Sequence, residues 1–488
     1  MQSEMLEKAR GYEREAAAEI PLEERPGFHL SAVTGWMNDP NGFSEYGGEY
    51  HLFYQYYPYA PRWDSMHWGH AKSADFVKWE YIPAALAPDK NYDSLGVFSG
   101  SALTDGEKHI LVYTGVSEET LENGKKQIRQ NQCLAVGDGV NYEKYEKNPI
   151  IVSEMIPVGN VCEDFRDPKI WKEDGVYYAV VGSRSDDGSG QIAMFRSKNL
   201  RDWEFDCILD KCENRYGKMW ECPDFFPLGE KRILVVSPQD MRAEGLEFHN
   251  GNNAIFLTGT YDKERKTFCR ENVQAADYGL DFYAPQTMET KDGRRIMVAW
   301  MKSWDADIRT GKGKWSGMMT FPRELSVKNG RVYQNPVREL QRYYANYTVR
   351  EIVLSEESSS LEGIEGRMLD LVIETKKDSS GKMEVCVAKN EKYSTRIVYD
   401  FDEEVLSFDR TYSGLYRDVV CKRDMVVRNR DGEVKIRILL DKYSVEIFAN
   451  DGESAMTSVI TTPMQARGIT FRAEGEICAQ ISKYDIVI

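Results

Sequence analysis

This sequence is poor in the residues that build metal centres and disulfide frameworks. Only six of its 488 residues are histidine, and the one close pair, His67 and His70, lies in strand-like sequence. The nine cysteines are an odd number, stand singly along the chain and show none of the paired spacings of zinc sites. We therefore expect reduced, mostly buried thiols and no metal site.

Long apolar runs and an excess of positive charge are also missing. No apolar stretch approaches the roughly 20 residues that span a bilayer. The formal net charge is −16, which argues against a nucleic acid or an anionic membrane as a partner. Residues 1–26 lack the charged-then-apolar pattern of a secretory signal and predict a polar helix from Ser3 to Glu19 that ends near Pro21. Together with the unpaired cysteines, this predicts a cytoplasmic protein.

Aromatic residues, by contrast, are abundant at 12%, which favours strands and surfaces on which sugars stack. A glycine followed by polar residues and then an apolar strand run occurs five times, roughly 60 residues apart. These glycines are Gly48, Gly106, Gly175, Gly229 and Gly293. About 60 residues hold four strands with their turns, which is the size of one propeller blade. Residues 27–335 are therefore predicted to form a five-bladed β-propeller.

The pattern changes after Phe321–Leu325. Residues 336–350 predict a linker helix with Leu340 on its apolar face. From 351 to 488 the chain shows alternating strands, such as Val434–Leu440, which predict a two-sheet sandwich. The expected fold class is all-β, a five-bladed propeller followed by a C-terminal β-sandwich.

Three acids and a serine occupy similar positions ahead of the repeat glycines. Asp39, Ser99, Asp167 and Glu221 each precede such a glycine by seven to nine residues. Equivalent positions of successive blades lie in a ring, so these side chains are expected to meet at one end of the central channel. Converging carboxylates repel one another, which raises at least one pKa and separates an acid from a base. Such a pair suits glycosyl transfer, although each acid taken singly equally suits a salt bridge or a turn cap.

The segments around these acids resemble the three signature motifs of glycoside hydrolase family 32, which contains invertases, sucrose-6-phosphate hydrolases and exo-acting fructanases. The three motifs are Trp36–Gly42, Phe165–Pro168 and Glu221–Pro223. Further resemblance lies in Phe53–Tyr56, His67–His70, Gly96–Gly100, Asp281–Gln286, Phe321–Leu325 and Leu440–Phe448. The likeness extends from about Phe28 to the end of the chain, and the order of the motifs makes it specific.

The resemblance implies a retaining β-fructosidase without a metal or organic cofactor. Asp39 would be the nucleophile, Glu221 the general acid and base, and Asp167 a transition-state stabiliser that holds fructose hydroxyls. The residues implied to bind the fructosyl unit are Asn38, Gln55, Trp63, Phe98, Ser99, Arg166 and Trp300. The partner would be a small sugar, and the sandwich would support the propeller or pair two chains as a homodimer.

Several substrates and reactions stay open. A small imported sugar suits a cytoplasmic enzyme, which leaves sucrose, sucrose 6-phosphate and short fructo-oligosaccharides, with water or a second sugar as acceptor. An inverting propeller acting on arabinan or xylan and a non-catalytic sugar-binding propeller are rivals. The Trp36–Gly42 stretch argues against the first, and the presence of all three acids argues against the second. The candidates for phosphate binding are Arg62, Arg242, Lys302, Lys312 and Lys314, each of which is more simply a solvated surface charge.

Overall fold

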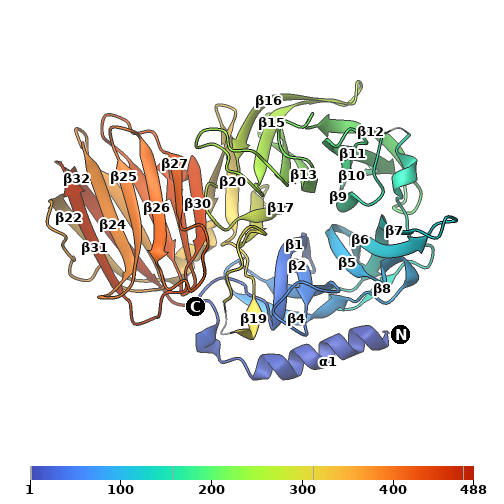
Figure 1. Cartoon of the computed structure of the whole chain (residues 1–488), viewed down its shortest axis with the longest axis horizontal. Coiled ribbons are helices and arrows are strands. Elements are labelled where there is room, and N and C mark those ends of the chain that lie inside the picture. The colour runs from blue at the N-terminus through green and yellow to red at the C-terminus, as the bar shows by residue number, and fades with distance from the viewer. Residues whose placement is uncertain (1–2, 158, 311–312, 476) are drawn as a thin grey trace.

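The computed structural model describes residues 3–157, 159–310, 313–475 and 477–488. Within these residues the chain forms seven β-sheets and one α-helix, with short 3-10 turns between some strands. Five sheets follow one another around an axis, and two further sheets stack face to face beside them (Figure 1). The predicted all-β fold class, a propeller followed by a sandwich, is confirmed.

The five sheets of the first part are the blades of the propeller. The first consists of β1 (Gly35–Tyr46), β2 (Glu49–Tyr57), β3 (His67–Ser73) and β4 (Trp79–Leu86), with β19 (Trp315–Ser316) added beside β1. The second consists of β5 (Gly96–Asp105), β6 (Lys108–Thr120), β7 (Lys126–Gly137) and β8 (Tyr142–Lys144). The third consists of β9 (Phe165–Glu173), β10 (Val176–Arg184), β11 (Gly190–Ser197) and β12 (Trp203–Lys211). The fourth consists of β13 (Trp220–Leu228), β14 (Lys231–Pro238), β15 (Ile255–Asp262) and β16 (Thr267–Ala275). The fifth consists of β17 (Tyr283–Glu289), β18 (Arg295–Trp300), β20 (Arg323–Lys328) and β21 (Arg331–Pro336).

The first strands of these blades close a ring. β1 contacts β5, β5 contacts β9, β9 contacts β13, β13 contacts β17, and β17 contacts β1 (Figure 1). Each first strand is joined to the second strand of its blade by a turn that contains one repeat glycine, and all five glycines have φ between 60° and 84°. Glycine adopts such angles with the least steric penalty because it has no Cβ. This requirement explains why a glycine recurs once per blade in the sequence.

The N-terminal helix α1 (Glu4–Ala18) lies along the outside of the propeller (Figure 1). Ser3 caps it by accepting a backbone N–H of the first turn at 3.2 Å. Arg10 donates from Nε to the carbonyl of Ala84 at 2.8 Å, and Glu13 accepts the Ala84 N–H at 2.9 Å. These contacts hold the helix against β4, and its ends lie within one residue of the prediction.

The prediction of a linker helix over residues 336–350 is wrong for most of these residues. Only one 3-10 helix forms there, η5 (Arg338–Tyr343), and the next strand, β22 (Tyr344–Leu354), begins directly after it. The reason is tertiary: β22 pairs along its length with β32 (Ile477–Ile486), so that backbone hydrogen bonds to the far end of the chain replace those of a helix. The other 3-10 turns of the described chain are η1 (Leu22–Glu24), η2 (Asn91–Asp93), η3 (Ser153–Met155) and η6 (Asn450–Gly452).

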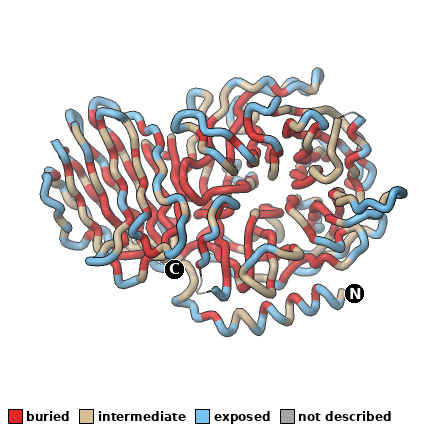
Figure 2. The backbone as a smooth tube through the Cα atoms, viewed as in Figure 1, coloured by how far each residue is buried: buried red, intermediate tan, exposed pale blue. Residues whose placement is uncertain are grey.

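Two sheets build the C-terminal sandwich. One contains, in order, β22, β32, β23 (Leu369–Thr375), β28 (Lys435–Leu440), β29 (Ser444–Ala449) and β30 (Ser454–Val459). The other contains β27 (Lys422–Val426), β26 (Val405–Tyr412), β25 (Ser394–Asp400), β24 (Lys382–Lys389) and β31 (Gly468–Glu474). Buried positions alternate with accessible ones along the outer strands (Figure 2), as expected for sheets that cover one shared core.

Buried charges join the propeller to the sandwich. His29, at the start of the propeller, contacts Asp441 through Nδ1 at 2.8 Å and Glu446 through Nε2 at 2.7 Å. Arg323 of β20 donates to Glu446 at 2.5 Å and to Asp277 at 2.9 Å. Since each of these side chains is buried, removal of one would leave its partner charged and unpaired. These buried ion pairs therefore help to hold the sandwich against the blade ring.

Candidate active site

The first strand of every blade loses regular pairing at a corresponding place. The register between the first and second strands shifts between Met37 and Pro40, Phe98 and Gly100, Arg166 and Lys169, Glu221 and Asp224, and Tyr283 and Gln286. Positive φ angles of 67° at Asp167, 49° at Cys222 and 51° at Ala284 accompany these shifts. Bulges of this kind redirect side chains and are common beside active sites.

The exact alignment of the acids differs from the one that the glycines predict. When the third and fourth blades are aligned on their strand pairing, Glu221 is level with Arg166, and Asp167 is level with Cys222. The prediction of one shared register for the acids is therefore wrong by one residue. The cause is that the repeat glycine is the second residue of the turn after β9 but the first after β13. Both acids nevertheless lie within the irregular segment of their strand.

Asp39 lies on β1 and is partly accessible. Its Oδ2 accepts a hydrogen bond of 2.7 Å from the Ser99 hydroxyl, and its Oδ1 accepts one of 3.0 Å from the Asn38 side-chain amide. Asn38 is itself fixed, because its Oδ1 accepts the Trp36 indole N–H at 2.8 Å. These donors hold the carboxylate of Asp39 in one orientation.

Asp167 lies on β9 and is held by its neighbours in the second and fourth blades. Its backbone N–H donates to the Thr114 hydroxyl at 2.9 Å, and its Oδ2 accepts the backbone N–H of Cys222 at 2.9 Å. The thiol of Cys222 lies 3.6 Å from Oδ2 of Asp167 and 3.6 Å from Oδ2 of Asp39. The two aspartates therefore face the same thiol.

Glu221 lies on β13 between a guanidinium and a phenol. Arg166 donates to its Oε1 from both Nε and Nη2, and Tyr283 donates to its Oε2 at 2.6 Å. The Tyr283 hydroxyl also lies 3.1 Å from the carbonyl oxygen of Ser237. Tyr283 is absent from the residues singled out in the sequence, although it lies in the matching segment Asp281–Gln286. Its place at the register shift of the fifth blade is the signal that identifies it.

Burial and mutual repulsion shift the titration of this cluster. Burial raises the pKa of Asp39, the charge of Glu221 raises it further, and the hydrogen bonds from Ser99 and Asn38 act in the opposite direction. Burial raises the pKa of Asp167 to about 7, with the neighbouring acids adding to the effect and a guanidinium opposing it. Burial beside the same acids raises the pKa of the Cys222 thiol well above its usual value. The thiol is thus a weak donor and not a nucleophile.

The three acids line one pocket of about 560 Å³ at the end of the blade ring. Six of the seven residues predicted to bind fructose line it with them: Asn38, Gln55, Trp63, Phe98, Ser99 and Arg166. Gln55 donates to the carbonyl of Val97 at 2.9 Å, and Trp63 meets the ring of Phe98 edge-on at 5.9 Å. The pocket thus combines acids, hydrogen-bonding groups and aromatic walls, as sugar sites do.

Trp300 is placed differently from the prediction. It is 0% exposed and packs edge-on against Trp36 at 5.8 Å, so it supports the wall and does not line the pocket. Trp304, which the sequence did not single out, takes the accessible position instead, with 41% of its surface exposed. The remaining lining residues that sequence reasoning missed are Gln130, Glu163, Asp164, Gln239, Asp240 and Asn252. Gln130 lies on β7, the third strand of its blade, and the other five lie in loops, where the repeat gives no register.

The basic residues considered for phosphate binding lie outside the described pocket lining. Arg62 is exposed and pairs with Asp64 at 3.2 Å, Lys302 is buried with Nζ 4.3 Å from the ring centroid of Trp36, and Lys314 donates to the carbonyl of Glu19. Arg242 is an exposed surface residue, and Lys312 lies outside the described residues.

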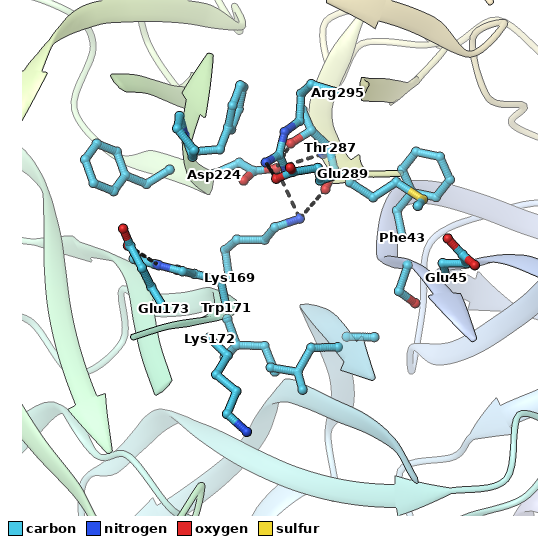
Figure 3. A pocket seen from close by; sticks show the side chains of 18 of the residues that line it. Phe43, Glu45, Lys169, Trp171, Lys172, Glu173, Asp224, Thr287, Glu289 and Arg295 are labelled. Atoms are coloured by element: carbon cyan, nitrogen blue, oxygen red, sulfur yellow. Dashed lines mark hydrogen bonds and ion pairs between the residues drawn. The ribbon is translucent and has the colours of Figure 1, made fainter. Parts of the chain in front are cut away.

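A second cavity of about 440 Å³ is lined by residues further along the first strands of the five blades (Figure 3). Lys169 points into it, and its ammonium lies 2.5 Å from the carbonyl oxygen of Thr287 and 3.2 Å from the carboxylate of Asp224. Arg295 pairs with Glu289 at its edge, at 2.8 Å. Because these charges neutralise one another, the chemistry is assigned to the pocket that contains the three acids.

Among the described residues, no group of three or more histidine, cysteine, aspartate or glutamate side chains is arranged so that it could hold a metal ion. Among the same residues, no helix has the length and apolar character needed to cross a membrane.

Known proteins match this chain in two parts, which correspond to the propeller and the sandwich. The pattern of the Glycosyl hydrolases family 32 N-terminal domain matches residues 29–336, and that of the family's C-terminal domain matches residues 337–487. A sucrose-6-phosphate hydrolase of Zymomonas mobilis subsp. mobilis is 38% identical over 445 residues, which cover 88% of this chain and 84% of that protein. A raffinose invertase of Escherichia coli is 36% identical over 456 residues, or 92% of each chain. A solved β-fructofuranosidase of Bombyx mori, a mutant form in complex with sucrose, superposes with a TM-score of 0.86 at 31% identity, covering 100% of this chain and 99% of the other.

Proposed function

This chain belongs to glycoside hydrolase family 32 and is a fructose-releasing β-fructofuranosidase, and we propose that it hydrolyses sucrose or sucrose 6-phosphate with retention of configuration. The observation that carries the mechanism is the convergence of Asp39, Asp167 and Glu221 from three blades on one pocket. The three roles are those that the family resemblance implies, and the different hydrogen-bond partners of the three acids support them.

Asp39 is the proposed nucleophile. In the first step one of its carboxylate oxygens attacks the anomeric C2 of the fructosyl unit while the bond from C2 to the glycosidic oxygen breaks. Oδ1 of Asp39 accepts one hydrogen bond, from Asn38, and keeps a further lone pair, whereas Oδ2 accepts from Ser99 and also faces the Cys222 thiol. The donors restrain the carboxylate without blocking it, which supports the assignment.

Glu221 is the proposed general acid and base. It gives its proton to the glycosidic oxygen as the leaving sugar departs. In the second step it takes a proton from water, the water oxygen attacks C2, and the bond between C2 and Asp39 breaks, which regenerates the enzyme and releases fructose. Arg166 and Tyr283 both touch Glu221, and in this proposal they orient it in both steps.

Asp167 is proposed to stay unreacted and to hold fructose hydroxyls. Its pKa of about 7 lets it accept hydrogen bonds when ionised and donate one when protonated. An ionised carboxylate in this position also favours the positive charge that develops on the fructosyl ring in the transition state. The hydrogen bond from the backbone N–H of Cys222 to its Oδ2 restrains this carboxylate.

The configuration of the product tests this mechanism directly. With sucrose as donor and methanol as acceptor, transfer gives a stable methyl fructofuranoside whose configuration is read by NMR. A retaining enzyme gives the β-anomer, whereas an α-anomer would exclude the roles assigned to Asp39 and Glu221. The same reaction run without methanol at high sucrose separates hydrolysis, which gives free fructose, from transfer to sugar, which gives kestose-type oligomers.

We place the reaction in the cytoplasm, and the nine unpaired cysteines support this location. We also propose that the sandwich supports the propeller, as the buried contacts of Glu446 suggest. Pairing of two chains through the sandwich is tested by light scattering across a range of protein concentration, where a dimer would double the measured mass.

A further inference from the structure

One side of the pocket is unused by the roles assigned above. Gln239, Asp240, Asn252 and Trp304 line it, and none of them belongs to the first strands that carry the three acids. They come from the chain that follows β14 and from the chain that follows β18. Since most of the pocket residues assigned to the fructosyl unit lie on the first strands, and the others on or just after β2, these loops are positioned to meet the leaving sugar.

Trp304 is held as a fixed aromatic surface. Its ring stacks on Trp36 with centroids 6.1 Å apart and planes 26° apart, and it meets Trp300 edge-on at 4.9 Å. The adjacent Asp305 accepts two hydrogen bonds from Asn252, one from the backbone N–H at 2.9 Å and one from the side-chain amide at 2.8 Å. The loop with Trp304 and the loop with Asn252 are therefore tied together.

The sandwich supports the same loop from behind. Arg417, in the chain between β26 and β27, pairs with Asp307, two residues beyond Asp305. Leu415 and Val419 from the same segment pack with Ile308 in a hydrophobic cluster. A preformed aromatic surface loses little conformational freedom when a sugar ring stacks on it.

The charges of the pocket are strongly one-sided. Among the described lining residues the carboxylates are Asp39, Glu163, Asp164, Asp167, Glu221 and Asp240, and the only guanidinium or ammonium is that of Arg166. Arg166 is already engaged, since it donates to Glu221, Asp164 and Gln130. Asp240 pairs with Lys218 at 3.6 Å, but both side chains are 68% exposed, so that solvent weakens the pair.

We propose that the leaving-group side of this pocket selects an uncharged sugar and discriminates against a sugar that carries a phosphate monoester. Trp304 offers the stacking face, and Asn252, Gln239 and Asp240 offer partners for hydroxyl groups. A phosphate brings about two negative charges into a pocket lined by acids, with Asp240 on the leaving-group side and Glu163 elsewhere in the lining, and finds no unengaged cation among the described lining residues. This inference rests on the proposed function and chooses between its two substrates.

The first test compares kcat/KM for sucrose and sucrose 6-phosphate at low salt. We expect a preference for sucrose of roughly tenfold or more, which shrinks as ionic strength rises. Equal or better turnover of sucrose 6-phosphate would overturn the inference and leave the proposed function standing. Failure to hydrolyse either sugar would overturn the proposed function itself.

The second test asks whether Glu163 and Asp240 cause the discrimination against sucrose 6-phosphate. The double variant Glu163→Gln, Asp240→Asn keeps the shape of both side chains and removes both charges, so we expect the relative kcat/KM for sucrose 6-phosphate to rise roughly threefold or more. The matched control is Glu391→Gln, Asp424→Asn, which removes two exposed charges on the sandwich and should leave the ratio unchanged. If the relative kcat/KM for sucrose 6-phosphate is unchanged in the Glu163→Gln, Asp240→Asn variant, or changes equally in the control, these two acids do not cause the discrimination.

The third test addresses the stacking surface. Trp304→Ala should raise KM for sucrose roughly tenfold, with a smaller change in kcat, and should have little effect on methyl β-fructofuranoside, which has no leaving sugar to stack. Tyr347→Ala, which removes an exposed aromatic ring on the sandwich, is the control. Equal losses on both substrates would show that Trp304 acts on the fold of the pocket and not on the leaving sugar.

Discussion

Tyr283 donates a hydrogen bond of 2.6 Å to the Oε2 atom of Glu221, opposite the side that Arg166 occupies. The phenol is fully buried, and burial beside the acids raises its pKa well above the usual value, so it stays protonated and donates throughout the working pH range. One carboxylate thus has a charged donor on one oxygen and a neutral donor on the other. The proposed acid and base is oriented from two neighbouring blades.

Tyr283→Phe should therefore lower kcat/KM for sucrose about tenfold without unfolding the protein. Because a hydroxyl that donates to a carboxylate favours its ionised form, its removal should move the alkaline limb of the pH profile of kcat/KM to higher pH. Steady-state kinetics at several pH values checks both effects. Tyr278→Phe removes a buried phenol that donates to Glu247, away from the pocket, and should not move the limb. A profile that shifts equally in both variants would refute the orienting role.

Asp39→Ala should abolish turnover, with a loss of roughly 10³-fold or more, because the covalent step loses its nucleophile. Ser99→Ala is the graded companion: it leaves the carboxylate in place and removes only one donor at 2.7 Å, so the expected loss is about tenfold. Near-ultraviolet circular dichroism and thermal unfolding establish that both variants are folded. Substantial activity in folded Asp39→Ala would exclude the nucleophile assignment.

Glu221→Gln should harm substrates with poor leaving groups most. The variant cannot protonate the glycosidic oxygen, and a leaving group that departs without a proton needs that help least. Comparison of kcat/KM for sucrose with that for an aryl β-fructofuranoside of low leaving-group pKa measures the difference. An equal loss on both substrates would mean that Glu221 is not the acid. Asp164→Asn, which changes another acid that Arg166 contacts, is the matched control.

Residue patterns were sufficient to predict the blade repeat and the three acids, because both depend on local rules. A turn with positive φ favours a glycine at Gly48 and its counterparts, and the acid on the first strand precedes that glycine by a nearly fixed number of residues. Counting residues back from the repeat glycine puts Asp167 and Glu221 at the same level, although strand pairing places them one residue apart. The reason is that the glycine occupies different positions in the two turns. Local spacing cannot reveal such a shift, since strand pairing decides it.

The leaving-group wall was beyond prediction for a related reason. Trp304 lies on an irregular loop whose place is set by Asn252 in another blade and Arg417 in the sandwich. Neither contact has a sequence period that would reveal it. Trp300, by contrast, lies at the end of a regular strand and is one of the residues that the resemblance implies for fructose binding, yet the fold buries it behind Trp36. A motif therefore identifies which residues gather at the site but not which of them reach its surface.

His29 should make stability depend on pH in the alkaline range. Its carboxylate partners raise its pKa to about 9 although burial opposes them, against about 6.5 in the unfolded chain. The folded protein thus binds this proton more tightly, so the contribution is complete below about pH 6.5 and is lost as pH rises through about 9. The difference corresponds to about 3 kcal/mol, an order-of-magnitude figure for a group paired with Asp441 and Glu446.

Thermal unfolding of the protein and of His29→Gln from pH 6 to pH 10 measures this contribution. Because the amide cannot take up the proton, we expect a large difference in Tm at pH 6 that narrows toward pH 10. His67→Gln is the control, since burial lowers the pKa of His67 to about 4 and keeps it neutral in the folded protein, so above about pH 8, where this side chain is neutral in the unfolded chain as well, its effect on Tm should not vary with pH. A constant difference for His29→Gln would show that the junction is held by packing and neutral hydrogen bonds, without a charged imidazolium between Asp441 and Glu446.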